Sequence, residues 1–331
     1  MEGRERILRC AARPADAGLE LAAFLAARFP YHDREGWGAL AAAGALLVNG
    51  APAGAGLVLK AGDEVRFVPP AGPEPLVDEA VAVLYEDADI MLVNKPGNLP
   101  AHPGGKYFNN TLWRILKDRL GVPEPGIVNR LDRETSGVTL VARHPRAAEL
   151  CRRQFDARGV TKKYTVFVEG DFAAPRRARG CMGPAAGSAV RKKMLFTPSA
   201  LAAPEPGRES RWADTEFTPV ERRGGITMLE AVPHTGRLHQ IRATLLALGF
   251  PVVGDKIYGA DETLFLRFLE DALTAEDRAR LRLPRQALHA AELSFRHPAD
   301  GRPMTARAPL PADLAGLRGD RGSLDKKARP Y

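Results

Sequence analysis

A single carboxylate stands between two arginines in residues 129–142, where Arg130 and Arg133 flank Asp132. Residues 138–142 (Val-Thr-Leu-Val-Ala) predict a strand that enters the core, and Gly137 allows the chain to turn tightly before it. Neighbouring guanidinium charge keeps a carboxylate ionised, so the segment predicts a reactive carboxylate at the edge of a sheet. The structural alternative is an aspartate that only neutralises two arginines, since ion pairs in loops are common and weak.

Three other segments share this polar character. Residues 93–96 (Val-Asn-Lys-Pro) come shortly before a His-Pro-Gly-Gly sequence at 102–105. Residues 162–164 (Lys-Lys-Tyr) begin a strand that places Tyr164, Val166 and Val168 on one face. Residues 234–242 predict a glycine turn followed by a helix whose first turn is rich in hydrogen-bond donors. Together the segments predict an anion-binding site around Asp132 and Tyr164.

A metal site would need a different set of side chains. The histidines available to it are His234, His239, His289 and His297. On a helix, the five-residue spacing of the first two separates them by about 140° around the axis, unlike same-face pairs three or four residues apart. The cysteines are Cys10, Cys151 and Cys181. Their odd number and wide spacing argue against disulfides and against a cysteine zinc site, so we expect no metal.

The composition is that of a water-soluble globular protein, with 45% hydrophobic and 27% charged residues among 331. No apolar stretch approaches the roughly 20 residues that cross a bilayer, and the first residues lead into no apolar signal segment. We therefore expect a cytoplasmic protein with no membrane partner. The sequence contains nothing that indicates an oligomer, and a monomer is the default expectation.

Positive charge is concentrated after residue 77. The net charge is +8, and residues 1–77 hold eight basic and nine acidic side chains, which leaves +9 for the remainder. Residues 172–204 contain six basic residues and no acidic one. These are Arg176, Arg177, Arg179, Arg191, Lys192 and Lys193. The segment predicts a mobile basic arm that contacts phosphates, and the alternative is a solvated loop.

A proline-rich linker at residues 69–75 predicts two domains, 1–75 and 76–331. The first contains helix patterns at 18–28 and 37–43 and strand patterns at 45–50 and 60–68. In the second, strands are predicted at 81–84, 90–93, 164–168, 226–232 and 288–295. Helices are predicted there at 111–120, 146–158 and 239–248, with one or two more within 260–282.

The first domain resembles an S4-like RNA-binding module, because Val-Asn-Gly occurs at 48–50 and Gly-Asp-Glu-Val at 62–65. It departs from that pattern around the second helix, where basic residues are replaced by Gly-Trp-Gly-Ala-Leu-Ala-Ala-Ala at 36–43. The alternative is a relic module that packs on the second domain.

The second domain resembles the RluA-type RNA pseudouridine synthases. The family motif H-R-L-D-x-x-T-S-G matches residues 129–137, with Asn129 in place of the histidine. G-R-x-H-Q-I-R matches 236–242, G-x-P-V-x-G-D-x-x-Y-G matches 249–259, and L-H-A-x-x-L-x-F-x-H-P matches 288–298. The resemblance implies an α+β catalytic domain with a largely antiparallel mixed sheet flanked by helices.

The resemblance also implies a reaction: uridine in ribosomal or transfer RNA is isomerised to pseudouridine without a cofactor, after the base is flipped out. It gives Asp132 the catalytic role at the ribose, Arg237 the ion pair with that carboxylate, and Tyr164 the stacking contact with uracil. Arg130 would fill the gap that the base leaves. Other implied substrate contacts are Asn129, Leu131, Arg133, Lys162, His239, Gln240, Arg242 and Leu288.

Two other functional classes are possible. A catalytically inactive RNA-binding protein with this fold could lose Asp132, whereas this chain retains Asp132, Tyr164 and Arg237. A glycoside hydrolase also uses carboxylates at a sugar carbon, but it needs a second acid placed for proton transfer. Glu134 is the nearby candidate, and its spacing gives no sign of that role. We therefore expect an RNA pseudouridine synthase.

Overall fold

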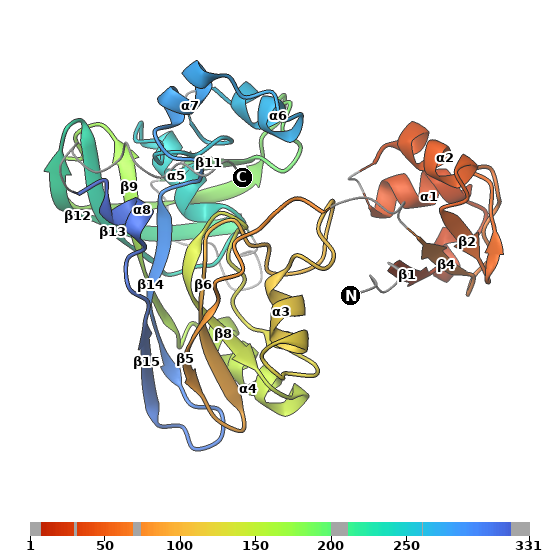
Figure 1. Cartoon of the computed structure of the whole chain (residues 1–331), viewed down its shortest axis with the longest axis horizontal. Coiled ribbons are helices and arrows are strands. Elements are labelled where there is room, and N and C mark those ends of the chain that lie inside the picture. The colour runs from red at the N-terminus through yellow and green to blue at the C-terminus, as the bar shows by residue number, and fades with distance from the viewer. Residues whose placement is uncertain (1–7, 30–31, 69–73, 200–210, 260, 319–331) are drawn as a thin grey trace. The chain divides into compact units, whose positions relative to one another are not determined.

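The computed structural model describes residues 8–29, 32–68, 74–199, 211–259 and 261–318 (Figure 1). The chain divides into two compact units, one formed by residues 1–75 and 104–108, the other by residues 76–103 and 109–331. Each described unit has its own buried apolar core.

The smaller unit combines two helices with a four-stranded sheet. Its elements are β1 (Leu8–Ala11), the 3-10 turn η1 (Pro14–Asp16), α1 (Leu21–Arg28), α2 (Arg34–Ala42), β2 (Leu46–Val48), β3 (Ala51–Pro52) and β4 (Glu64–Phe67). The strands are antiparallel in the order β1-β4-β2-β3. Trp37 on α2 is fully buried and meets the ring of Phe67 edge-on. The alanine-rich helix α2 therefore contributes to the core of the smaller unit. The resemblance of this unit to an S4 module stays a prediction.

The larger unit is built on one sheet of eleven strands. The strands are β5 (Ala82–Glu86), β6 (Ile90–Lys95), β7 (Gly126–Ile127), β8 (Ser136–Ala142), β9 (Thr161–Glu169), β10 (Arg176–Pro184), β11 (Met194–Pro198), β12 (Trp212–Arg223), β13 (Ile226–Pro233), β14 (Leu288–Arg296) and β15 (Pro303–Arg307). Their order is β11-β10-β12-β13-β9-β14-β8-β6-β5, with β15 beside β14 and β7 beside β8. Of the described pairs only β8 and β14 are parallel, so the predicted largely antiparallel α+β fold is confirmed.

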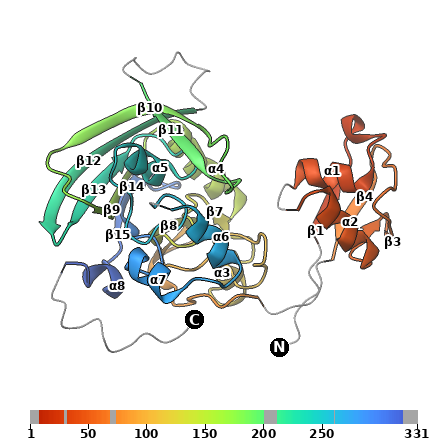
Figure 2. The same cartoon turned by 90° about the horizontal axis from the view of Figure 1, so that it is seen from above.

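Six helices are described in the larger unit. They are α3 (Leu112–Asp118), α4 (Pro145–Asp156), α5 (Gln240–Ala247), α6 (Thr263–Leu269), α7 (Ala275–Leu281) and α8 (Ala312–Ala315). Alternation along β6 sends Met91 and Val93 into the cluster with α3, and Ile90 and Leu92 into the cluster with Cys151 of α4. Strands β10, β12 and β13 curve around α5 (Figure 2). The sheet therefore positions α5, which carries much of the site described below.

The predicted mobile arm at 172–204 is wrong. Residues up to 199 are described, and half of them form β10 and β11, which pair with each other and add to the sheet next to β12. The reason is a period-two pattern that the arginines obscure: Ala178, Gly180 and Met182 are buried, while the residues between them face solvent. Residues 200–204 lie outside the described residues.

Candidate active site

Asp132 lies in the loop between β7 and β8, beside the point where β8 and β14 run parallel. In that register Gly137 lies opposite Ala290. Gly137 has a φ of 118°, and a Cβ there would lie 2.2 Å from the carbonyl oxygen of Ala290. Only glycine fits, so the special backbone predicted at this position is present because β14 approaches so closely. This contact fixes the end of the loop that carries Asp132.

Arg242, on α5, joins two carboxylates. Its Nη1 donates to Oδ2 of Asp132 at 2.9 Å, and its Nε and Nη2 donate to Asp255 at 2.6 and 2.8 Å. Asp255 is itself held by backbone N–H groups of Ile257 and Tyr258. A buried, two-point contact of this kind fixes the plane of the guanidinium. Arg242 therefore presents one N–H to Asp132 from a rigid support.

The environment keeps Asp132 ionised. Burial acts to raise the pKa of its carboxyl, but the charge of Arg242, the proximity of His239 and a hydrogen bond from Gln286 hold the pKa below its usual value. Nε2 of Gln286 lies 3.3 Å from Oδ2 of Asp132. The side chain is 28% exposed, which leaves part of the carboxylate open to the adjoining cavity. A free face on an ionised carboxylate is what a catalytic group needs.

A cavity of about 630 Å³ opens at this carboxylate. Eleven of the twelve residues predicted to act in catalysis or substrate binding line it. They are Asn129, Arg130, Leu131, Asp132, Lys162, Tyr164, Arg237, His239, Gln240, Arg242 and Leu288. The exception is Arg133, which bonds Glu134 at 2.7 Å and stacks on Phe268 of α6. The prediction that Arg133 contacts the substrate lacks this geometric support, because the side chain turns toward α6.

Tyr164 and Lys162 reach the cavity from the same face of β9. Tyr164 is half-buried, and burial together with the nearby charge of Asp132 raises the pKa of its phenol. Its hydroxyl is therefore protonated at neutral pH. Nζ of Lys162 donates to the carbonyl oxygen of Thr235 at 3.2 Å, and burial followed by the charge of Arg237 lowers its pKa to about 8. An apolar ring and two polar groups thus face one cavity.

The predicted ion pair between Arg237 and Asp132 is wrong. The arginine on Asp132 is Arg242, whereas Nε of Arg237 donates to the carbonyl oxygen of Trp212 at 2.9 Å. Arg237 precedes α5, and Arg242 lies on the helix face that meets the loop of Asp132. Arg237 still lines the cavity. Gln240 holds this turn, because its Oε1 accepts from the backbone N–H of Arg237 and from the hydroxyl of Thr235.

Three basic residues were predicted to contact RNA. Arg191, Lys192 and Lys193 lie in the short segment directly before β11. Lys193 makes an ion pair with Glu262 at 2.8 Å. Lys192 is exposed, and its Nζ lies 4.3 Å from the centre of the Phe265 ring. The pKa of Lys192 is lowered, first because neighbouring protein atoms displace part of the water around its ammonium group, and then by the positive charges of Arg242 and Arg133. Arg191 is exposed next to it. This turn therefore places Lys192 close to the charged groups around Asp132.

Comparison with known proteins decides the family. The RNA pseudouridylate synthase family model matches residues 89–247. An uncharacterized RNA pseudouridine synthase from Chlorobaculum parvum is 33% identical over 283 residues, 82% of this chain and 84% of the relative. The chain belongs to the RNA pseudouridine synthase family. Its members are isomerases, so the prediction made from the motifs is confirmed.

Two further family members extend the comparison. Ribosomal large subunit pseudouridine synthase D of Xanthomonas campestris is 34% identical over 311 residues, covering 91% of this chain and 88% of the relative. The structure titled Human RNA Pseudouridylate Synthase Domain Containing 1 matches with a TM-score of 0.53 at 25% identity, covering 72% of this chain and 86% of that one. The larger unit thus has the fold of a pseudouridine synthase. No helix in the described residues is long and apolar enough to cross a membrane.

Three residues that support the site were not predicted. Asp255 anchors Arg242, Gln286 donates to Asp132, and Tyr258 bonds His239. Asp255 and Tyr258 are the named Asp and Tyr of the motif G-x-P-V-x-G-D-x-x-Y-G of the pseudouridine synthase family, so a signal for them existed. Gln286 lies two residues before the last motif, where no pattern indicated it. Their roles depend on contacts between segments far apart in sequence.

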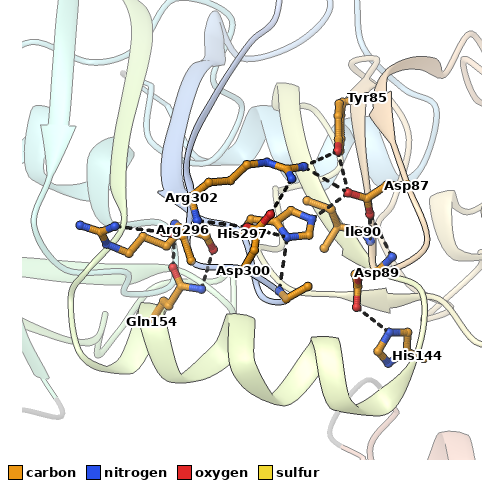
Figure 3. Close-up of polar contacts among 12 residues, drawn as sticks. Tyr85, Asp87, Asp89, Ile90, His144, Gln154, Arg296, His297, Asp300 and Arg302 are labelled. Carbon is orange, nitrogen blue, oxygen red and sulfur yellow. Dashed lines mark hydrogen bonds and ion pairs between the residues drawn. The ribbon is translucent and has the colours of Figure 1, made fainter.

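A second polar cluster joins the turn between β5 and β6 to the turn between β14 and β15 (Figure 3). In the described residues, Asp87, Asp89 and His297 form the group whose spacing would suit a metal ion. Asp87 already accepts four hydrogen bonds, from the N–H groups of Asp89 and Ile90, the hydroxyl of Tyr85 and Nε2 of His297. Burial opposes ionisation, yet these bonds lower the pKa of Asp87 to about 2. The cluster is a hydrogen-bonded tie between two turns.

Proposed function

We propose that this chain converts uridine in RNA of the large ribosomal subunit to pseudouridine, with Asp132 as the group that acts at the ribose. The observation that carries the proposal is the Asp132 carboxylate, held ionised by Arg242 at 2.9 Å and exposed to the cavity that Tyr164 and Leu288 also line. The name of the Xanthomonas relative supports the choice of RNA.

The proposed reaction requires an ionised carboxylate beside the ribose and a cavity for the base. The bond from N1 of uracil to C1′ breaks and a bond from C5 to C1′ forms. A proton leaves C5 and N1 gains one, so the product is an isomer and no redox change occurs. Attack on C1′ and removal of the C2′ proton both require an ionised carboxylate beside the ribose, and the environment of Asp132 provides it. Because the base must leave the RNA stack, a cavity of base size next to this carboxylate is also required.

Neighbouring residues support a flipped base. Tyr164 offers a ring for stacking and a protonated hydroxyl, and Leu288, at 4% exposure, offers an apolar wall. Arg130 is exposed at the mouth of the cavity, a position that suits insertion into the gap left by the base. Arg237 and Lys162 supply positive charge for the phosphate on either side.

The test is the substitution Asp132→Asn, which keeps the shape of the side chain and removes its charge. Pseudouridines are mapped in ribosomal and transfer RNA from cells that carry no copy of the gene, the wild-type gene or the variant. We expect one or more ribosomal positions to lose the modification without the gene and to regain it only with the wild type. In vitro, the rate should fall by about 10³-fold or more.

Three outcomes would contradict the proposal or part of it. A variant as active as the wild type would remove Asp132 from the mechanism. Unchanged pseudouridine maps, combined with RNA binding that Asp132→Asn does not alter, would favour the inactive RNA-binding protein. Positions lost only from transfer RNA would keep the enzyme and overturn the choice of RNA. Thermal unfolding of the variant serves as the folding control.

A further inference from the structure

The side chain of His239 lies between Asp132 and the buried side chain of Tyr258. It precedes α5 with a left-handed backbone, φ 56°, and its side chain is 7% exposed. Its Nε2 lies 3.8 Å from Oδ1 of Asp132, and its Nδ1 lies 2.9 Å from the hydroxyl oxygen of Tyr258. The two ring nitrogens therefore face different partners. Which nitrogen carries the hydrogen decides what the ring presents to Asp132.

The hydroxyl of Tyr258 decides this question. The backbone N–H of Met194, at the start of β11, donates to the Tyr258 oxygen at 2.7 Å. A backbone N–H can only donate, so the phenol uses one lone pair as an acceptor and keeps its own hydrogen to give away. In the described residues, the hydrogen bonds of this oxygen go to Met194 and to His239. If Nδ1 of His239 donated instead, the hydrogen of the Tyr258 hydroxyl would have no acceptor among the described residues, so this arrangement favours Nδ1 of His239 as the acceptor.

We propose that Tyr258 is a positioning residue that holds His239 as the Nε2–H tautomer, so that a neutral ring presents an N–H donor to the Asp132 side of the cavity. At 3.8 Å this N–H is too far for a hydrogen bond to Asp132 itself. Its partner is an oxygen of the substrate bound beside the carboxylate, and this part of the inference rests on the proposed function. The opposite tautomer would turn a lone pair toward a carboxylate.

The charge of the ring fits this arrangement. Burial, followed by the positive charge of Arg242, lowers the pKa of His239 to about 4. The ring is therefore neutral at pH 7 and carries one hydrogen. Tyr258 faces Arg242 as well, with the guanidinium 4.8 Å from the centre of its ring. Replacing Tyr258 by phenylalanine keeps that stacking contact and removes only the hydroxyl.

The first test needs no RNA. Nitrogen-15 spectra of the histidine side chains are recorded for the wild-type protein at pH 7, and His239→Gln assigns the signal of interest by its loss. We expect Nδ1 of His239 without a hydrogen and Nε2 with one. A ring protonated at Nδ1 or at both nitrogens would overturn the proposal. This result is independent of whether any RNA is modified.

The second test removes the hydroxyl. In Tyr258→Phe, we expect the signal of His239 to shift toward the Nδ1–H tautomer. Pseudouridine formation should lose about 10-fold to 100-fold in kcat with little change in KM, as when a hydrogen-bond partner that orients a ligating histidine is removed. The matched control is Tyr85→Phe, which removes a hydroxyl bonded to Asp87 at 2.6 Å in the other cluster (Figure 3). An unchanged tautomer in Tyr258→Phe would contradict the proposal.

A double-mutant cycle separates positioning from structural support. The amide of His239→Gln has N–H donors that need no tyrosine to set a tautomer. We therefore expect Tyr258→Phe to reduce kcat in the wild-type background and to have almost no effect in the His239→Gln background. An equal loss in both backgrounds would show that Tyr258 acts through the fold and not through His239. If no RNA is modified, the proposed function fails, and the spectra of the wild type and Tyr258→Phe still decide the assignment.

Discussion

Arg242 and Asp255 form a buried two-point ion pair at 2.6 and 2.8 Å, and Nη1 of the same guanidinium donates to Asp132 at 2.9 Å. Asp255 has no exposed surface, so its charge depends on Arg242. The pair acts as a support for one hydrogen bond. The ionised state of the reactive carboxylate is thus connected to the stability of the core.

Arg242→Gln should change both the stability of the protein and the ionisation of Asp132. The variant leaves Asp255 buried without a cation, which should lower the free energy of unfolding by about 3–5 kcal/mol. It also removes the charge that lowers the pKa of Asp132. The pKa of Asp132 should therefore rise. As the pH is lowered, the variant should lose activity at a higher pH than the wild type does, because the reaction needs the ionised carboxylate. Urea unfolding and kcat/KM against pH measure the two effects.

The double variant Arg242→Gln with Asp255→Asn is the matched control. Two amides can hydrogen-bond where two charges stood, so most of the unfolding free energy should return. The fall of kcat/KM at acid pH should still occur at a higher pH than in the wild type, because Asp132 still lacks its cation. An acid limb in the wild-type position would show that Arg242 does not set the pKa of Asp132.

Motif spacing predicted which residues meet, but not how they pair. Eleven of twelve candidate residues line one cavity, because each motif lies at a strand end or a helix start and the sheet brings these ends together. The choice between Arg237 and Arg242 depended on the rotation of α5. That rotation is set by the left-handed backbone of His239 and by Asp255, more than ten residues from Arg242. No local pattern encodes it.

Gly137→Ala should disrupt the site through the backbone. The added Cβ would lie 2.2 Å from the carbonyl oxygen of Ala290, in a strand that cannot move without breaking the parallel pairing of β8 and β14. We expect the free energy of unfolding to fall by about 3 kcal/mol or more. Gly183→Ala on β10 is the control, since a Cβ there has no atom within 4 Å. Equal stability of the two variants in urea would contradict this account.

Asn129 stands where the family motif has histidine, and its amide holds the middle of β8. Nδ2 donates to the carbonyl oxygen of Val138 at 3.1 Å, and Oδ1 accepts from the N–H of Leu140 at 2.6 Å. Asn129→Ala deprives a buried strand of both partners and should lower the free energy of unfolding by about 1–3 kcal/mol. Asn129→His, whose ring can accept from Leu140, should recover part of the loss. An alanine variant as stable as the wild type would show that the amide has no structural role.

Lys192→Gln tests whether the turn before β11 contacts RNA. Lys192 is exposed near the charged groups around Asp132, whereas Lys193 is held by Glu262. If Lys192 contacts one phosphate, the variant should bind RNA more weakly, and the slope of log affinity against log salt should flatten by about 0.7–0.9. The control is Arg307→Gln on β15, a 75% exposed side chain paired with Glu292. Filter binding from low to high salt gives both slopes. Parallel lines for Lys192→Gln and Arg307→Gln would remove Lys192 from the RNA contact, and adding Arg191→Gln would then show whether its neighbour makes it.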